Sequence, residues 1–240
     1  MITPVVNPWL GMTIVLAVLS GLLGGLRLYQ CACTPQPEVV RKLFHLGGGL
    51  TTLALPWLFA HAWPVLALAG LTILGLFMLS HVGAFKDGLG GVLCGVARYS
   101  RGEIYFPLGV SLVFVLARGD ALLFSIPMLI LTLADPAAAL VGMRYGRWHY
   151  AATASAKSAE GSMAFFIVAF VSVHIPLLLW TNMNGAETLR IALLVTLLST
   201  LVEAVARGGM DNLLVPLASC ILLRAFLAMG MGGLAPCDMF

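Results

Sequence analysis

Residues 121–142 read ALLFSIPMLILTLADPAAALVG, and Asp135 is the one charged side chain among them. A helix that crosses a bilayer needs about 20 predominantly apolar residues, so this run predicts a membrane span. A carboxylate at the centre of a span costs roughly 2.5–3.5 kcal/mol, and Pro136 after it lacks the N–H that a regular helical turn uses. The run therefore predicts a membrane protein with an ionisable, functional group inside a loosened helix.

The composition of the whole chain supports a membrane protein. Of its 240 residues, 60% are hydrophobic and 10% are charged, whereas a soluble domain carries about 25% charged residues. The mean hydropathy is +1.01. These values exclude a soluble enzyme, a disordered chain and a nucleic-acid-binding domain, and the net charge of +3 is too small to attract nucleic acid.

About eight apolar segments are candidate spans, with a range of six to nine because short segments depend on tertiary packing. They cover residues 8–29, 43–60, 62–80, 104–117, 121–142, 162–180, 187–206 and 212–229. The chain shows no internal repeat and no long linker. The sequence thus predicts an all-α, polytopic transmembrane helical bundle that forms one domain over residues 1–240, beginning with the helix at 8–29.

The basic residues predict the orientation of this bundle. In the eight-helix arrangement ten of the thirteen basic side chains fall on one side, namely Arg27, Arg41, Lys42, Lys86, Arg98, Arg101, Arg144, Arg147, Lys157 and Arg207. Only Arg118, Arg190 and Arg224 fall on the other. Because basic loops stay in the cytoplasm, the richer side is predicted to be cytoplasmic and both termini external.

Polar residues of the predicted cytoplasmic side form several clusters. Arg41, Lys42 and His45 open the span at 43–60, and Arg41 and His45 share one helix face. Three glycines at 47–49 follow, which permit close approach of another helix or a ligand. The two interpretations are ordinary snorkelling anchors at a membrane boundary and a functional site.

A second cluster follows Asp135, which lies seven residues, or about 10 Å of helix, before Gly142. Ala138, Gly142 and Gly146 share its helix face and make a smooth surface beside the acid. One interpretation is a structural Asp neutralised by a neighbouring Arg. The other is a site in which the acid acts on a ligand.

A third cluster lies where a loop enters the span at 162–180. Ser158 or Ser162 could cap that helix, with Glu160 in its first turn. Alternatively, the N–H groups at the helix N-terminus and Lys157 would form an anion site that suits phosphate. The residue types fit both interpretations.

Two weaker elements complete the set. Glu103 is either part of a surface ion pair or is carried into a site by a broken helix, which Pro107 permits. Glu203 lies about one turn inside an apolar helix, and Asp211 and Asn212 are placed to cap the last helix. We treat Glu103, Asp211 and Asn212 as site support.

Taken together, these motifs resemble the membrane family of CTP-dependent lipid-alcohol kinases, which contains dolichol kinase, phytol kinase and CTP-dependent diacylglycerol kinase and is related to phosphatidate cytidylyltransferase. The matching motifs run in the family's order over a catalytic portion at residues 38–220. They are Arg41-Lys42-Leu-Phe-His45, Gly102-Glu103-Ile-Tyr-Phe-Pro107, Asp135-Pro-Ala-Ala-Ala-Leu-Val-Gly142-x-x-x-Gly146, Lys157-Ser158-Ala-Glu160-Gly-Ser162 and Glu203-x-x-x-Arg207-Gly-x-x-Asp211-Asn212.

The resemblance implies transfer of the γ-phosphoryl group of CTP to the hydroxyl of a lipid alcohol, with Mg²⁺ as the metal. An isoprenoid alcohol such as a polyprenol, dolichol or phytol is the expected acceptor. The cytidylyltransferase relatives carry an Asp-rich signature with a lysine near the C-terminus, and this chain has no lysine after Lys157. That difference favours the kinase branch.

Roles for the polar residues follow from this reaction, because phosphoryl transfer needs positioning and charge neutralisation. Asp135 is predicted to bind the metal or orient the hydroxyl, with Glu160 and Glu203 as further metal ligands. The general base is His45 or Asp135, and the sequence does not choose between them. The predicted phosphate-binding groups are Arg41, Lys42, Gly142, Gly146, Arg147, Lys157 and Ser158, with Arg144 as a further candidate.

Other functions remain open at this point. A CTP-dependent diacylglycerol kinase or a cytidylyltransferase-like lipid transferase would use similar groups. An ion or solute transporter also carries intramembrane acids and broken helices, although the charges here gather on one side. The expected location is a prokaryotic inner membrane, as a multi-pass protein with its active site facing the cytoplasm.

Overall fold

The computed structural model describes residues 6–81, 102–150 and 157–228. Within these residues the chain is helical and contains no strand. Its elements are α1 (Pro8–Cys33), α2 (Pro37–Leu53), α3 (Leu55–Leu58), α4 (Ala62–His81), α7 (Gly102–Ala117), α8 (Ala121–Leu129), the π-helical segment η1 (Ile130–Ala134), α9 (Asp135–Tyr145), α10 (Ala159–Trp180), α11 (Gly185–Val205) and α12 (Asp211–Ala228). The predicted all-α fold class is confirmed.

Five helices of the described residues are long and apolar enough to cross a membrane: Pro8–Cys33, Ala121–Tyr145, Ala159–Trp180, Gly185–Val205 and Asp211–Ala228. Ala62–Met78 and Ile104–Ala117 are shorter apolar helices. Each predicted span overlaps a helix. The bounds predicted for the segment at 43–60 differ most from those observed. Here α2 already begins at Pro37, because proline suits the first turn of a helix. The chain then turns at Ala54 before α3.

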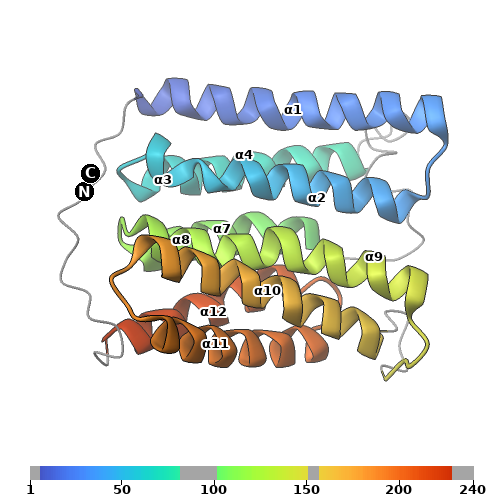
Figure 1. Cartoon of the computed structure of the whole chain (residues 1–240). Coiled ribbons are helices and arrows are strands. Elements are labelled where there is room, and N and C mark those ends of the chain that lie inside the picture. Colours follow the sequence, from blue (N-terminus) through green and yellow to red (C-terminus); the bar gives the residue numbers. More distant parts are fainter. Residues whose placement is uncertain (1–5, 82–101, 151–156, 229–240) are drawn as a thin grey trace.

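The helices lie side by side along one direction, and the long helix made of α8, η1 and α9 runs through the middle of the bundle (Figure 1). It packs against α2, α7, α10 and α12. Half of its apolar window is buried, the largest share among the five candidate spans. The span that carries Asp135 is therefore the central helix of the protein.

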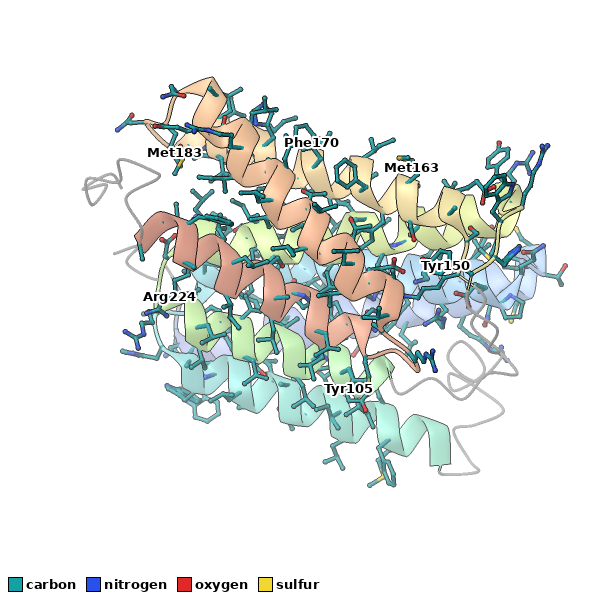
Figure 2. All side chains as sticks on the ribbon, turned by 90° about the horizontal axis from the view of Figure 1, so that it is seen from below. Tyr105, Tyr150, Met163, Phe170, Met183 and Arg224 are labelled. Atoms are coloured by element: carbon teal, nitrogen blue, oxygen red, sulfur yellow. The ribbon has the colours of Figure 1, made fainter. Side chains whose placement is uncertain are left out.

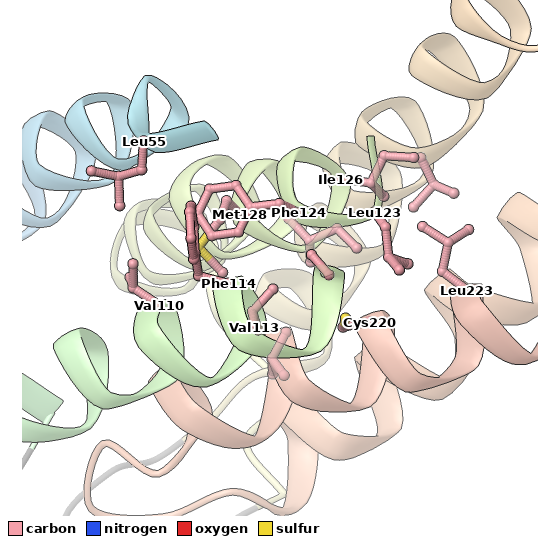
Figure 3. Packing of buried hydrophobic residues seen from close by; sticks show 14 of the residues in the cluster. Leu55, Val110, Val113, Phe114, Leu123, Phe124, Ile126, Met128, Cys220 and Leu223 are labelled. Atoms are coloured by element: carbon pink, nitrogen blue, oxygen red, sulfur yellow. The ribbon is translucent and has the colours of Figure 1, made fainter. Parts of the chain in front are cut away.

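The hydrophobic core joins this central helix to its neighbours (Figure 3). Phe114 of α7 and Phe124 of α8 meet edge to face, with ring centroids 5.4 Å apart at 76°. Such aromatic pairs add about 0.5–1.5 kcal/mol beyond their buried area. The buried residues around them come from α7, α8 and α12, and include Val110, Val113, Leu123, Ile126, Met128, Cys220 and Leu223.

Tryptophans mark the two ends of the bundle. Trp9, Trp57, Trp63 and Trp180 lie at the end where α1 begins and α10 finishes, and Trp148 lies at the opposite end. All five are between 43% and 77% exposed. Because Trp gathers at membrane–water interfaces, this distribution places the bilayer normal along the helices, with the exposed leucines between the two levels facing lipid.

The basic residues separate along the same axis. Arg118, Arg190 and Arg224 belong to the end where α1 begins, and Figure 2 shows Arg224 at the end of the bundle opposite to Tyr150. The described members of the predicted cytoplasmic set lie at the Tyr150 end, namely Arg27, Arg41, Lys42, Arg144, Arg147, Lys157 and Arg207. Lys86, Arg98 and Arg101 lie outside the described residues. The predicted charge asymmetry therefore holds for the described residues.

The close contact between α9 and α10 can be tested by substitution. A Cβ atom at Gly161 would lie 2.9 Å from the Ala138 carbonyl oxygen, whereas one at Gly70 on α4 would meet no atom within 4 Å. Gly161→Ala should cost about 1–3 kcal/mol by overpacking. Gly70→Ala should stabilise its helix by roughly 0.5–1 kcal/mol. Thermal unfolding in detergent measures both variants, and an equal shift in both would contradict the packing.

Candidate active site

The central helix is distorted just before Asp135. In the π register of η1, the N–H that would reach the Leu131 carbonyl belongs to residue 136, which is a proline and has none. His45 Nε2 takes that place, 3.1 Å from the Leu131 oxygen. The helix turn that Pro136 was predicted to loosen is therefore an opening into which a side chain of α2 inserts.

Asp135 forms a buried ion pair at this opening. Its Oδ2 lies 2.6 Å from Lys42 Nζ and 3.6 Å from His45 Nε2. Asp135 is 9% exposed and Lys42 is 8% exposed. Three residues singled out in the sequence thus meet at one point, across the α2–α9 contact. The partner of the acid is Lys42 rather than an Arg.

The hydrogen bond of His45 fixes its tautomer. A carbonyl oxygen can only accept, so Nε2 carries the hydrogen and a neutral ring keeps its lone pair on Nδ1. The ring also packs edge to face on Phe106 of α7, with centroids 4.9 Å apart. His45 is therefore held as an oriented imidazole with one nitrogen able to accept a proton.

Arg41, the residue before Lys42 on α2, forms a different pair. Its guanidinium bonds the Glu38 carboxylate through two contacts of 2.6 Å and 3.0 Å. It also interacts electrostatically with Asp135 and Asp211. Glu38 was not among the predicted site residues, although its place one turn before Arg41 is a signal for such a pair.

A second ionic cluster connects α10, α11 and α12. Lys157 Nζ lies 2.6 Å from Glu203 Oε1 and 3.7 Å from Asp211 Oδ2, and it also bonds the Glu203 carbonyl. Ser162 Oγ donates to Glu203 Oε2 over 3.4 Å, and Tyr150 OH is 2.6 Å from Ser162 Oγ. Lys157 thus ties two carboxylates together at the start of α10.

The two clusters lie at the same end of the bundle. Glu203 interacts electrostatically with Asp135, and Arg41 does so with Asp211. The side chains come from α2, α9, α11, α12 and the loop that precedes α10, all at the Tyr150 end of the bundle. The structure therefore brings Arg41, Lys42, Asp135, Lys157 and Glu203 to the same end of the bundle, and their roles in a site stay predictions.

Asn212 lies in the first turn of α12 and contacts α7. Its Nδ2 donates to the Gly102 carbonyl over 3.1 Å and so joins α12 to the first residue of α7. The backbone of Glu103 lies in the first turn of α7, which continues through Pro107 as one helix. The side chain of Glu103 lies outside the described residues.

Gly142 and Gly146 serve the contact between α9 and α10. Cβ atoms at these positions would lie 3.2 Å and 2.9 Å from Ser158 Oγ. That hydroxyl caps α10 by accepting from the Gly161 N–H over 3.1 Å. The helix-cap interpretation of Ser158 is therefore confirmed, and contact of these glycines with phosphate stays a prediction.

Other predicted residues lie toward the rim of the site. Glu160 Oε2 accepts from the Trp148 N–H over 3.4 Å, and Arg147 is exposed. The Arg144 guanidinium lies 5.7 Å from the centre of the Tyr145 ring. Glu160 thus supports the loop between α9 and α10, and no contact between it and Asp135 or Glu203 is present among the described side chains.

The carboxylates of these clusters suit a metal ion that arrives bound to a nucleotide. Among the residues that the structure describes, no three His, Cys, Asp or Glu side chains lie close enough to cage an ion. Mg²⁺ is usually held by one or two carboxylates together with substrate phosphates. Glu203 and Asp211 both approach Lys157 Nζ, at 2.6 Å and 3.7 Å, so this pair of carboxylates fits this mode of binding.

A cavity of about 240 Å³ adjoins the ionic cluster. It lies among α1, α2, α4 and α7, and its polar lining includes Arg41, His45 and Asn212. His45 thus borders the cavity on one side and contacts Asp135 on the other. No sequence pattern predicts this cavity, because its walls are ordinary apolar helix faces.

No family model and no solved structure matches the chain. Over 190 residues it is 32% identical to the phytol kinase of Synechocystis sp., an alignment that covers 78% of this chain and 79% of that protein. The chain belongs to the phytol kinase family. This membership confirms the resemblance to lipid-alcohol kinases and makes the chain a kinase that acts on an alcohol.

The buried ion pair of this kinase can be tested by double substitution. Lys42→Met leaves the Asp135 carboxylate buried and unpaired, which should cost about 3–5 kcal/mol of stability. Adding Asp135→Leu removes the lone charge and should restore most of that stability without restoring activity. Thermal unfolding of the single and double variants in detergent measures the effect. A double variant that is less stable than Lys42→Met would contradict the direct pairing.

Proposed function

We propose that the chain is an integral membrane kinase that transfers the γ-phosphoryl group of CTP to the hydroxyl of an isoprenoid alcohol of the phytol type. The observation that carries the proposal is the position of His45. Its ring borders an apolar cavity and lies 3.6 Å from the carboxylate of the buried ionic cluster. A hydroxyl on a lipid tail and a phosphate on a soluble nucleotide could meet there.

His45 is the proposed general base. The lone pair on its Nδ1 accepts the hydroxyl proton while the alcohol oxygen attacks the γ-phosphorus. The bond from that phosphorus to the bridging oxygen breaks, and CDP leaves. Asp135 lies beside the other ring nitrogen and stabilises the imidazolium that forms, as a carboxylate does for a catalytic histidine elsewhere. In this proposal His45 is therefore the general base, and Asp135 is the residue that stabilises it.

The second ionic cluster is the proposed nucleotide side. Lys157 and Arg41 would bind phosphate oxygens, together with Arg147 at the rim. Glu203 and Asp211 would hold Mg²⁺, which neutralises phosphate charge when it is bound. In the structure Lys157 and Arg41 are already paired with carboxylates, so nucleotide and metal would exchange partners within the same set of charges.

The distribution of basic residues indicates which side of the membrane the site faces. The end of the bundle that carries the ionic clusters also carries the basic residues, which favours a cytoplasmic location for that end. The cytoplasm is where a nucleoside triphosphate is available. We therefore propose a multi-pass protein of a prokaryotic inner membrane with the active site on the cytoplasmic side.

A label-transfer assay tests this function. Purified protein in detergent with Mg²⁺ would receive γ-labelled CTP or γ-labelled ATP, each with phytol, geranylgeraniol, a dolichol or diacylglycerol. We expect label in phytol and geranylgeraniol with CTP as donor, and CDP as the second product. Release of pyrophosphate would assign a cytidylyltransferase instead. A folded protein that labels no lipid would contradict a kinase.

Substitutions at the site should remove this activity while the protein still inserts into the membrane. Asp135→Asn and Lys157→Ala are expected to abolish label transfer. His45→Asn should reduce it by about 10²–10⁴-fold, the usual contribution of a general base. Arg118→Gln, at the opposite end of the bundle, is the control and should retain activity. The site assignment would be wrong if Lys157→Ala kept near-normal turnover.

A further inference from the structure

The cavity beside His45 is elongated along the helices. Its lining on α2 runs from Arg41 to Thr52, a separation of eleven residues that at 1.5 Å per residue spans about 17 Å. On α4 the lining runs from Leu76 back to Val65. Since the hydrocarbon core of a bilayer is about 30 Å thick, the cavity extends from the site end of the bundle over about half of that thickness.

The two ends of the cavity differ chemically. Arg41, His45 and Asn212 line the end at the ionic cluster. At the far end the lining residues are Leu55 and Val65, which are 3% and 2% exposed and belong to the main hydrophobic core. The cavity is therefore polar where it meets the site and closed by packed aliphatic side chains at its other end.

One wall of the cavity also reaches the lipid-facing surface. Leu71 lines the cavity and is 47% exposed. Gly75, one turn further along α4, also lines it, and a Cβ atom at that position would meet no atom within 4 Å. A molecule dissolved in the bilayer could thus pass beside α4 and reach the cavity without crossing water.

We infer that this cavity holds the hydrocarbon tail of the acceptor alcohol, with the hydroxyl at His45, and that its closed end limits the length of the tail. This inference rests on the proposed kinase function and specifies its substrate. The volume of about 240 Å³ lies just below the range of roughly 300–1,000 Å³ for small-molecule sites. It suits one chain, so a single-tailed alcohol fits and a two-tailed diacylglycerol does not.

A matched pair of substitutions on α4 tests the position of the tail. Ala69 lines the cavity between Val65 and Thr72, whereas its neighbour Gly70 does not line it. Ala69→Phe should shorten the cavity and lower turnover of phytol by about tenfold or more, because even one methylene in a hydrophobic pocket changes rates by about 10–200-fold. Turnover of the shorter alcohol geraniol should be retained. Gly70→Phe should change neither rate.

Each outcome decides the inference. A folded Ala69→Phe variant with an unchanged ratio of phytol to geraniol turnover would overturn it, as would wild-type protein that phosphorylates dolichol as fast as phytol. A wild-type protein that phosphorylates no alcohol would overturn the kinase function instead.

Photolabelling provides a measurement that does not depend on turnover. A photoreactive phytol analogue with the reactive group at the tail end should label peptides of α2, α3 or α4 near Leu55 and Val65, and excess phytol should compete. Labelling mainly on α10 or α11 would place the tail elsewhere and overturn the inference even in an active kinase.

Discussion

The buried ion pair between Lys42 and Asp135 is the constraint on which the site depends. A carboxylate deep in a membrane helix is tolerated only with a partner, and here the partner lies 93 residues earlier in the chain, at 2.6 Å. That contact sets how α2 lies against the central helix. Because His45 follows Lys42 by less than one turn, the same contact brings the imidazole to Asp135 and to the Leu131 carbonyl that Pro136 leaves open.

This arrangement explains how a membrane fold could serve a water-soluble phosphoryl donor. The cavity among α1, α2, α4 and α7 opens toward lipid, and the cluster around Lys157 joins α10, α11 and α12 at one end of the bundle. His45 lies between the two. The acceptor could thus stay in the bilayer while its hydroxyl reaches a site at the membrane surface.

Hydropathy predicted the helices well because a bilayer requires every spanning segment to be apolar and internally hydrogen-bonded. The cost of burying charge likewise pointed to Asp135, Lys157 and Glu203. Sequence spacing could not show that Lys42 pairs with Asp135, or that Glu160 contacts the loop at Trp148 instead, because these contacts depend on how helices pack. The cavity was missed for the same reason, since lipid-facing and cavity-facing leucines have the same sequence signal.

The most direct test of whether the nucleotide and the alcohol meet at one site is a structure of the protein with a non-hydrolysable CTP analogue, Mg²⁺ and phytol. We expect the γ-phosphate between Lys157 and Arg41, and the phytol hydroxyl within hydrogen-bond distance of His45, with its tail along α2 toward Leu55. Nucleotide bound at the end of the bundle that carries Arg118 and Arg224, or a hydroxyl remote from His45, would contradict the account.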